Sequence, residues 1–359
     1  MIQTAIARDS LAPLPQTALP RSHRRTVRVY PTWRGHAVGM ARPQAVGTSE
    51  RIPLDSCLSI KVLRPALGGL YAHGYRSLEV AGGEPLAYPH LPALLERAME
   101  LGMTTTIISD GSLLDERRLE RLGGLVDQLF IKVAGQQASH DRLYGLGTFN
   151  AMRRRLEDVR RSGIRFGFVF TLTQHNVHEL AWLARFAVSH GASSLHIQAL
   201  GPHAELQAEP AAACPDEREV AFAYLAAQQA SVLTGRSLRI AMDFTEVEQL
   251  RQQPELALAG DRDPLARTRQ LADILSPLVI EPDGTVVPLK AGLARDFRIG
   301  NLYHKPFNAL VADWRESGWP LFRALCRWVH KQTVTTHELP FIDWPGALYR
   351  AARVCTTRR

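Results

Sequence analysis

The sequence is short of cysteine. Its four cysteines, Cys57, Cys214, Cys326 and Cys355, are scattered over 359 residues. No two of them have the close spacing of a local metal-binding knuckle. Scattered thiols are typical of a reduced, cytoplasmic protein, so the pattern predicts no disulfide framework.

The sequence also lacks long apolar runs and has few lysines. No apolar stretch approaches the roughly 20 residues that cross a bilayer, so we expect no membrane partner. The net charge is +8, yet only five of the 43 basic residues are lysines. The arginines are spread along the chain, whereas nucleic-acid-binding proteins concentrate their basic residues in a stripe. We therefore expect no nucleic-acid partner.

What the sequence does contain is an apolar run, 78–81, that stops at Gly82, Gly83, Glu84 and Pro85. The run predicts a buried parallel strand, and the residues after it predict a turn. Glycines without a Cβ let the backbone approach a ligand closely, and Glu84 adds a carboxylate beside them. Taken alone, this short motif also fits an ordinary strand-to-helix turn.

Strands and helices alternate around this motif. An earlier strand is predicted at 26–30 and a later one at 104–108, which ends in a turn at Asp110 and Gly111. Three more strands are predicted, at 126–133, 165–172 and 194–200, with helical patterns between them. Right-handed crossovers between such units put the carboxyl ends of all strands at one face, where the site is expected.

With this strand order, the chain resembles the radical S-adenosylmethionine (SAM) superfamily over residues 26–206, and weakly to about residue 344. That family has Gly-Gly-Glu-Pro after its second strand and a Thr-Asn-Gly-like turn after its third. The resemblance implies an α/β fold, a partial (β/α)6 TIM-like barrel with a smaller α+β C-terminal extension. It also implies that the cofactor-binding residues are found at Gly82, Gly83, Glu84, Pro85, Asp110 and Lys132.

The resemblance fails at the family's signature, three cysteines spaced Cys-x3-Cys-x2-Cys after the first strand. Their positions are held here by Gly35, Gly39 and Arg42. Iron–sulfur clusters are held by cysteine thiolates, and none of these residues can replace one. We therefore expect no [4Fe–4S] cluster, and a pseudoenzyme that has lost it.

A second departure falls at the end of the fourth strand. The family has a Ser-x-Asp-Gly-like turn there that helps to bind SAM, and this chain has Lys132, Ala134 and Gly135. We expect any remaining SAM binding to be weak. The pair His140–Asp141 follows, as it often does in the family, and is interpreted as a helix N-terminus.

Four regions are predicted along the chain. A disordered N-terminal tail covers 1–25, the barrel covers 26–206, a helical connector covers 207–270, and the extension covers 271–359. Within the extension, the strands 275–280 and 285–289 flank a turn and predict a hairpin. The layout resembles the SPASM or Twitch extension of peptide-modifying radical SAM enzymes. Ser276 and Leu289 stand near where cysteines for an auxiliary cluster are expected.

The histidines predict no metal site. His175 and His178 are three residues apart, and His196 and His203 lie at or just after a strand end. A zinc site needs further ligands at suitable spacing, and the pattern does not supply them.

Three functions remain open. The chain is a repurposed relative that binds a peptide, a small anion or a partner enzyme; or a non-radical enzyme that uses the old pocket; or an atypical radical SAM enzyme. Arg42 and Lys132 are both expected at the mouth of the barrel, where two cations favour an anionic ligand. Alternatively, Glu84 pairs with one of them and the mouth is only a structural plug.

Overall fold

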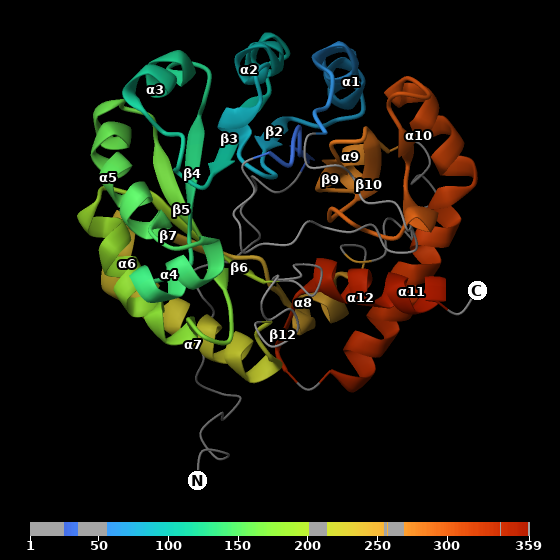
Figure 1. Cartoon of the computed structure of the whole chain (residues 1–359). Helices are drawn as coiled ribbons and strands as arrows, with labels where there is room; N and C mark the ends of the chain where they lie inside the picture. The colour runs from blue at the N-terminus through green and yellow to red at the C-terminus, as the bar shows by residue number, and fades with distance from the viewer. Residues whose placement is uncertain are drawn as a thin grey trace.

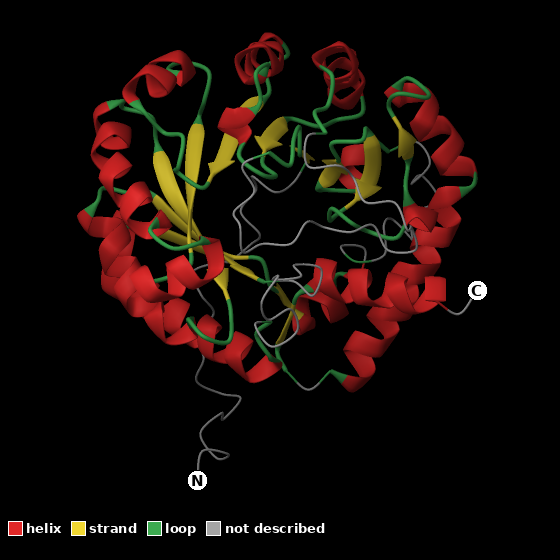
Figure 2. Ribbon diagram, in the orientation of Figure 1, coloured by secondary structure: helices red, strands yellow, loops and turns green. Residues whose placement is uncertain are grey.

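The computed structural model describes residues 25–34, 56–200, 214–254, 257, 269–337 and 339–357. Almost all of the predicted tail 1–25 lies outside these residues, and so do Gly35, Gly39 and Arg42. The strands form a curved open sheet, and the helices surround this sheet on its outside (Figures 1 and 2). None of the described helices is both long and apolar enough to cross a membrane.

The sheet has ten strands in the order β11-β10-β9-β1-β2-β3-β4-β5-β6-β7. Its first six strands in the chain are parallel neighbours in sequential order, as predicted. They are β1 (Thr26–Val29), β2 (Ser77–Val80), β3 (Thr104–Ser109), β4 (Gln128–Val133), β5 (Phe166–Leu172) and β6 (Ser194–Ala199). The described strands β7 and β11 at the two ends do not pair with each other, so the predicted partial barrel is confirmed.

Two further parallel strands extend this core. The strand β7 (Arg239–Met242) joins β6, and β9 (Leu278–Ile280) joins β1 on its other side. The predicted hairpin is confirmed, because β9 pairs with β10 (Thr285–Pro288) in antiparallel fashion. The short strand β11 (Gly300–Asn301) completes the edge, and β8 (Thr245–Glu246) and β12 (Phe341–Ile342) form a separate pair.

The helices pack on the outside of the sheet, where their apolar faces meet the outward side chains of the strands. In the barrel they are α1 (Ile60–Ala72), α2 (Leu91–Glu100), α3 (Glu116–Leu122), α4 (Gln137–Tyr144), α5 (Thr148–Arg161), α6 (Leu180–Ser189) and α7 (Glu217–Thr234). After β8 they are α8 (Val247–Gln252), α9 (Leu271–Ile274), α10 (Phe307–Glu316), α11 (Gly318–Thr336) and α12 (Trp344–Thr357). Short 3-10 turns include η2 (Pro85–Ala87), η3 (Val177–Glu179), η4 (Gly235–Ser237) and η7 (Arg295–Phe297).

The core is the interface between the sheet and these helices. All seven residues of β5 are buried, which is the pattern of a central strand covered on both faces. The inward face has its own small apolar cluster, Ala81, Ile108 and Val169, with Tyr30 and Phe130 against it.

The sheet is continuous from the predicted barrel into the predicted extension. Val27 pairs with Leu278, and the backbone N–H of Thr26 donates to Ser276 Oγ over 2.9 Å. Leu289, at the other end of the hairpin, has a left-handed φ of +62°. The division at 206 and 271, and the SPASM or Twitch character of the extension, stay predictions.

Candidate functional site at the mouth of the barrel

The candidate site lies at the carboxyl ends of β1–β4. We call it the mouth, and it consists of the described segments 30–34, 81–85, 109–112 and 132–135. The segment after β1 is fixed to the turn after β2 by two backbone hydrogen bonds. Gly83 N donates to Thr32 O over 3.2 Å, and Glu84 N donates to Arg34 O over 2.8 Å.

The two glycines are needed for this close approach. Gly82 has a φ of +113°, which side-chain-bearing residues rarely adopt. A Cβ on Gly83 would lie 2.3 Å from Arg34 O and 2.7 Å from Trp33 O, both backbone atoms. The Gly-Gly pair is thus required for packing the turn against the segment after β1.

Glu84 is fully buried and ties the ends of β2 and β3 together. Its carboxylate accepts hydrogen bonds from Ser109 Oγ over 3.0 Å, from Asp110 N over 2.8 Å and from Leu86 N over 3.0 Å. The last of these caps η2, in which Pro85 is the first residue. The sequence analysis predicted Glu84 and Asp110 at one site, but no pattern in the sequence indicated that Ser109 would bond to Glu84.

Burial also changes the ionisation of Glu84. Loss of solvent around the carboxylate, with the neighbouring Asp110 adding to it, raises the pKa of Glu84 to about 8. The hydrogen bond from Leu86 and the charge of Lys132 act in the opposite direction. Glu84 therefore changes its charge within the physiological pH range.

Lys132 reaches from β4 across β3 to the glycine turn. Its ammonium donates to Gly82 O and to Gly83 O, each over 3.2 Å, and its side chain is half-buried. Lys132 and Glu84 form no ion pair within the part of the chain that the structure describes. The cation is held by backbone carbonyls, so the alternative that Glu84 pairs with Lys132 does not describe this geometry.

The end of β3 presents Asp110 at the surface of the mouth. One carboxylate oxygen accepts from Ser112 N over 2.8 Å, and the side chain is half-buried. Gly111 follows with a φ of +84°. Of the two acidic residues in the mouth, Asp110 is therefore more accessible than Glu84.

The turn after β4 is closed by Glu179, which the sequence did not single out. Its carboxylate accepts from Gln136 N and, over 2.6 Å, from Ser139 Oγ. A Cβ on Gly135 would lie 2.0 Å from this carboxylate, which explains the glycine. No local pattern links Glu179 to this turn, because 43 residues separate it from Gln136.

His140 and Asp141 have structural partners. Asp141 accepts from Phe149 N over 2.8 Å and from Gly147 N over 3.0 Å, so it caps the start of α5. His140 is buried, and this burial lowers its pKa to about 4. A neutral ring fits its contact, in which Nδ1 accepts from Ala134 N over 3.4 Å.

Below the mouth, charged side chains pair inside the barrel. Arg28 on β1 forms an ion pair with Glu79 on β2, and His196 Nε2 lies 2.6 Å from Asp243 Oδ1. Burial alone would lower the pKa of His196, but the carboxylate of Asp243 outweighs it and the net shift is upward. The same pairing gives His196 a structural partner inside the barrel.

The described residues include no set of three thiols that could hold a cluster. Cys57 is exposed and forms a backbone bridge to Thr32, Cys326 is buried in α11, and Cys355 is exposed in α12. Cys214 lies elsewhere, near the charges of Lys290 and Arg350. The described donor set therefore does not fit the [4Fe–4S] cluster that the resemblance implies.

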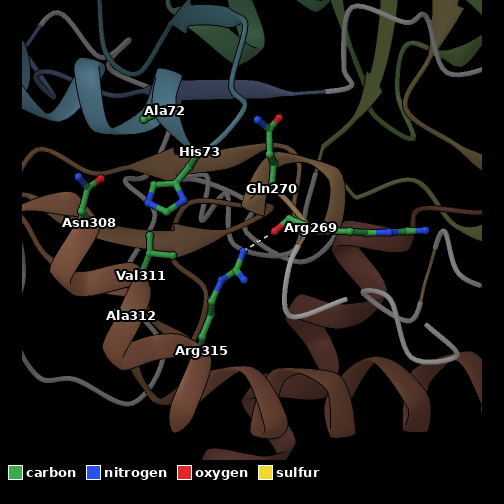
Figure 3. Close-up of a pocket in the computed structure, with 8 residues that line it drawn as sticks. All are labelled: Ala72, His73, Arg269, Gln270, Asn308, Val311, Ala312 and Arg315. Carbon is green, nitrogen blue, oxygen red and sulfur yellow. Dashed lines mark hydrogen bonds between the residues drawn. The ribbon is translucent and has the colours of Figure 1, made fainter. Parts of the chain in front are cut away.

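A separate hollow of about 350 Å³ lies between the outer helices α1 and α10 (Figure 3). His73, Asn308 and Arg315 lie around it, and Arg315 Nη2 donates to Arg269 O over 2.6 Å. The other lining residues are Ala72, Gln270, Val311 and Ala312. This hollow is on the helical layer and shares no residue with the mouth.

Comparison with known proteins gives the family of the barrel. The sequence profile of the Radical SAM superfamily matches residues 62–187. An Fe-coproporphyrin III synthase from Methanosarcina barkeri is 28% identical over 36% of this chain and 33% of its own length. A PqqA peptide cyclase from Ruegeria pomeroyi is 26% identical over 61% of this chain and 56% of its own length. The chain thus spans only about a third to a half of these two relatives.

Solved structures give the same fold. Streptococcus suis SuiB bound to S-adenosylmethionine has a TM-score of 0.61 at 14% identity, over 85% of this chain and 68% of that one. Native anSMEcpe with bound AdoMet has a TM-score of 0.60 at 14% identity, over 93% and 97% of the two chains. Residues 62–187 therefore match a radical SAM domain in sequence, and the chain has the fold of these solved structures.

Proposed function

We propose that this protein is a radical SAM relative that holds no [4Fe–4S] cluster and binds a peptide at the mouth of the barrel without redox chemistry. The observation that carries this proposal is the replacement of the three cluster thiols by Gly35, Gly39 and Arg42. The positive charge of Arg42 is permanent, so it cannot serve as an iron ligand. The positions of Cys57 and Cys326 in the fold support the same conclusion.

Weak SAM binding follows from Lys132. The backbone oxygens of Gly82 and Gly83 are acceptors that the ammonium group of SAM could use, and the ammonium of Lys132 already occupies them. The turn at Ala134 also lacks the polar side chains of the family pattern. For both reasons we expect the mouth to favour a ligand other than SAM.

A peptide with an acidic group is the ligand class that we favour. The named relatives include a PqqA peptide cyclase, and SuiB has been solved bound to its precursor peptide SuiA, with a TM-score of 0.52 to this chain. Arg42 is the proposed bidentate donor to a carboxylate of that peptide, with Lys132 adding positive potential. A small anion or a partner enzyme with an acidic segment would use the same groups.

The second candidate is an enzyme that reuses the mouth, either non-radical or an atypical radical SAM enzyme. It is favoured by the names of the relatives, which are a synthase, cyclases, dehydratases and a pre-heme d1 synthase. It requires a cluster held by unusual ligands or a chemistry that needs none.

The first experiment measures cluster content. The purified chain is reconstituted anaerobically with iron and sulfide, beside a variant in which all four cysteines are replaced by serine. We expect equal background iron and sulfide in both. About four irons and four sulfides per wild-type chain, with absorbance near 400 nm that the variant lacks, would contradict the proposal.

The second experiment tests the mouth. Melting temperature is followed with peptides that end in Asp or Glu and with matched peptides that end in amidated Asn or Gln. We expect a rise for the acidic peptides that falls with added salt and is lost in Arg42→Ala. Arg154→Ala on the outer face of α5 is the matched control and should keep the rise. An equal rise in both variants, or none in the wild type, would rule out an anion site at Arg42.

A further inference from the structure

The hollow between α1 and α10 is bordered by three segments of the chain (Figure 3). Ala72 and His73 lie at the end of α1, and Arg269 and Gln270 come directly before α9. One face of α10 forms the third wall, with Asn308, Val311, Ala312 and Arg315. These positions are three and four residues apart, so their side chains lie along the same side of the helix.

Two glycines let these walls come close to one another. A Cβ on Gly69 of α1 would lie 3.0 Å from Asn308 Oδ1, so a side chain there would press against α10. A Cβ on Gly74 would lie 2.4 Å from Gln270 Oε1, so a side chain there would push away the segment before α9. The end of α1 is therefore packed closely against both of the other walls.

The charged side chains around the hollow are all basic. The lining residues that the structure describes include His73, Arg269 and Arg315, and none of the described lining residues is acidic. Arg315 Nη2 donates to Arg269 O over 2.6 Å, whereas the side chain of Arg269 points away from the other lining residues (Figure 3). The two basic groups that face the hollow are thus the guanidinium of Arg315 and the imidazole of His73.

Acids on the neighbouring helices do not line the hollow. Asp273 on α9 forms an ion pair with Arg25, and Asp313 on α10 forms one with Lys305, each over 2.7 Å. Glu316, the other acid of α10, is exposed and is not among the lining residues. The charge of the described walls is therefore positive.

The pKa values of the two basic groups are both shifted downward. Partial burial lowers the pKa of the Arg315 guanidinium. Burial also lowers the pKa of His73, and the charge of Arg315 adds to this, while a hydrogen bond with Asn308 acts in the opposite direction. A carboxylate beside them would raise both pKa values, because an opposite charge favours the protonated form. The electrostatics of the hollow therefore favour an anion.

The rest of the wall is apolar. The side chain of Val311 borders the hollow, and the methyl groups of Ala72 and Ala312 border it as well. The volume of about 350 Å³ is at the lower end of the range of ligand clefts. A planar guanidinium binds a carboxylate through two parallel N–H groups. A carboxylate with a short aliphatic chain would thus contact both the basic groups and the apolar wall.

We infer that the hollow is a binding site for a small aliphatic carboxylate, with Arg315 as the bidentate donor, His73 as a second donor and Val311 against the aliphatic chain. Inorganic phosphate matches the charges but leaves the apolar wall without a partner, so we expect it to bind more weakly than the carboxylate. The hollow shares no residue with the mouth, so the inference is independent of the ligand proposed there.

The first test is calorimetric titration with butyrate as the probe. Arg42→Ala is the parent chain, so that a carboxylate bound at the mouth does not contribute. We expect butyrate to bind at least about tenfold more tightly than its neutral amide, butyramide, because the amide cannot accept two charge-assisted hydrogen bonds. Arg315→Gln should weaken butyrate binding at least about tenfold. Arg185→Gln, at an exposed position on α6, is the control and should leave it unchanged.

A second variant tests the hollow without removing a contact of the fold. Ala72 is exposed, so Ala72→Asp adds a negative charge at the wall, and we expect it to weaken butyrate binding at least about tenfold. Ala72→Asn has the same size without the charge and should weaken it less. Absence of butyrate binding, equal binding of butyrate and butyramide, or equal affinity in Ala72→Asp and Ala72→Asn would overturn the inference.

The pH dependence of binding tests the part played by His73. A bound carboxylate raises the pKa of His73, so binding takes up a proton and becomes tighter as the pH falls. We expect butyrate affinity to rise at least about threefold between about pH 7.5 and 5.5, and His73→Gln to remove this rise. The same pH dependence in His73→Gln would overturn the assignment of His73 as a donor.

Discussion

At the scale of single residues, the burial of Glu84 makes the free energy of unfolding depend on pH. Its ordinary pKa is 4.5, and burial raises this pKa to about 8 in the folded state. Between these two values the folded chain keeps a proton that the unfolded chain has released. The free energy of unfolding therefore falls as the pH rises through this window, and the loss is complete above about pH 8.

The variant Glu84→Gln should remove this dependence. It carries no charge, so we expect its stability relative to the wild type to rise by on the order of 4 kcal/mol between pH 5 and pH 9. Its amide nitrogen cannot accept from Leu86 N or Asp110 N as a carboxylate oxygen does, and this loss lowers its stability by the same amount at every pH. Urea unfolding at pH 5, 7 and 9 measures the rise. Glu96→Gln, at an exposed position on α2, is the control. Parallel pH profiles for wild type and Glu84→Gln would refute the prediction.

Lys132 gives a second prediction at this scale. Lys132→Ala frees Gly82 O and Gly83 O from the ammonium that they now hold. We expect affinity for SAM to rise at least about fivefold, equivalent to about 1 kcal/mol, because the ligand ammonium no longer competes with an internal one. Isothermal titration calorimetry measures the change. The exposed Lys305→Ala is the control, and unchanged or weaker binding in Lys132→Ala would argue against competition.

At the scale of elements, a glycine in the turn after β2 and a glycine in helix α1 should respond in opposite ways to substitution by alanine. Gly83→Ala forces a Cβ against backbone atoms of Trp33 and Arg34, and we expect it to cost at least about 2 kcal/mol of unfolding free energy. Gly68→Ala in α1 meets only Arg97 Nη2 at 3.7 Å and should stabilise by about 0.5–1 kcal/mol. Urea unfolding of both variants at one pH compares them. Similar effects of the two substitutions would contradict this prediction, because the backbone of Trp33 and Arg34 would then have moved to accept the Cβ of residue 83.

The elements also show what the sequence could predict. Local apolar patterns were enough to predict the six strands, and the family resemblance implied their order in a partial barrel. Contacts between distant segments were not predictable from such patterns. Ser109 reaches Glu84, and Lys132 reaches Gly82, because the parallel register of β2, β3 and β4 aligns them. The interpretation of His140 and Asp141 as a helix N-terminus was wrong in place, because both lie inside α4, although the Asp141 side chain accepts from the first N–H groups of α5.

At the scale of the whole molecule, the sheet connects the barrel with the C-terminal part of the chain. The sequence predicted a hairpin at 275–289, but no local signal could show that β9 pairs with β1. That pairing depends on two edges brought together by the complete fold. The strand β1 therefore has partners on both sides only when both parts of the chain are present.

This continuity predicts cooperative unfolding. Leu278 is fully buried on β9 and pairs with Val27, so Leu278→Ala should cost about 3 kcal/mol and lower amide protection in β2 and β3 as well as in β9. Native-state hydrogen exchange measures this. Leu321→Ala on α11, at a side chain with 37% exposure, should change little. Loss of protection confined to β9 and β10 would indicate two independent units.

The pairing of β1 with β9 also has a consequence for how the chain is made. Thr26 and its partner Ser276 are 250 residues apart in sequence. At about 5–20 residues per second, a ribosome needs roughly 12–50 s to synthesise the chain between them. During this time one edge of β1 has its backbone groups open to other strands, and open edges of this kind promote aggregation. Slower initiation, lower temperature or chaperones that cover this edge would therefore raise the yield of folded protein during expression.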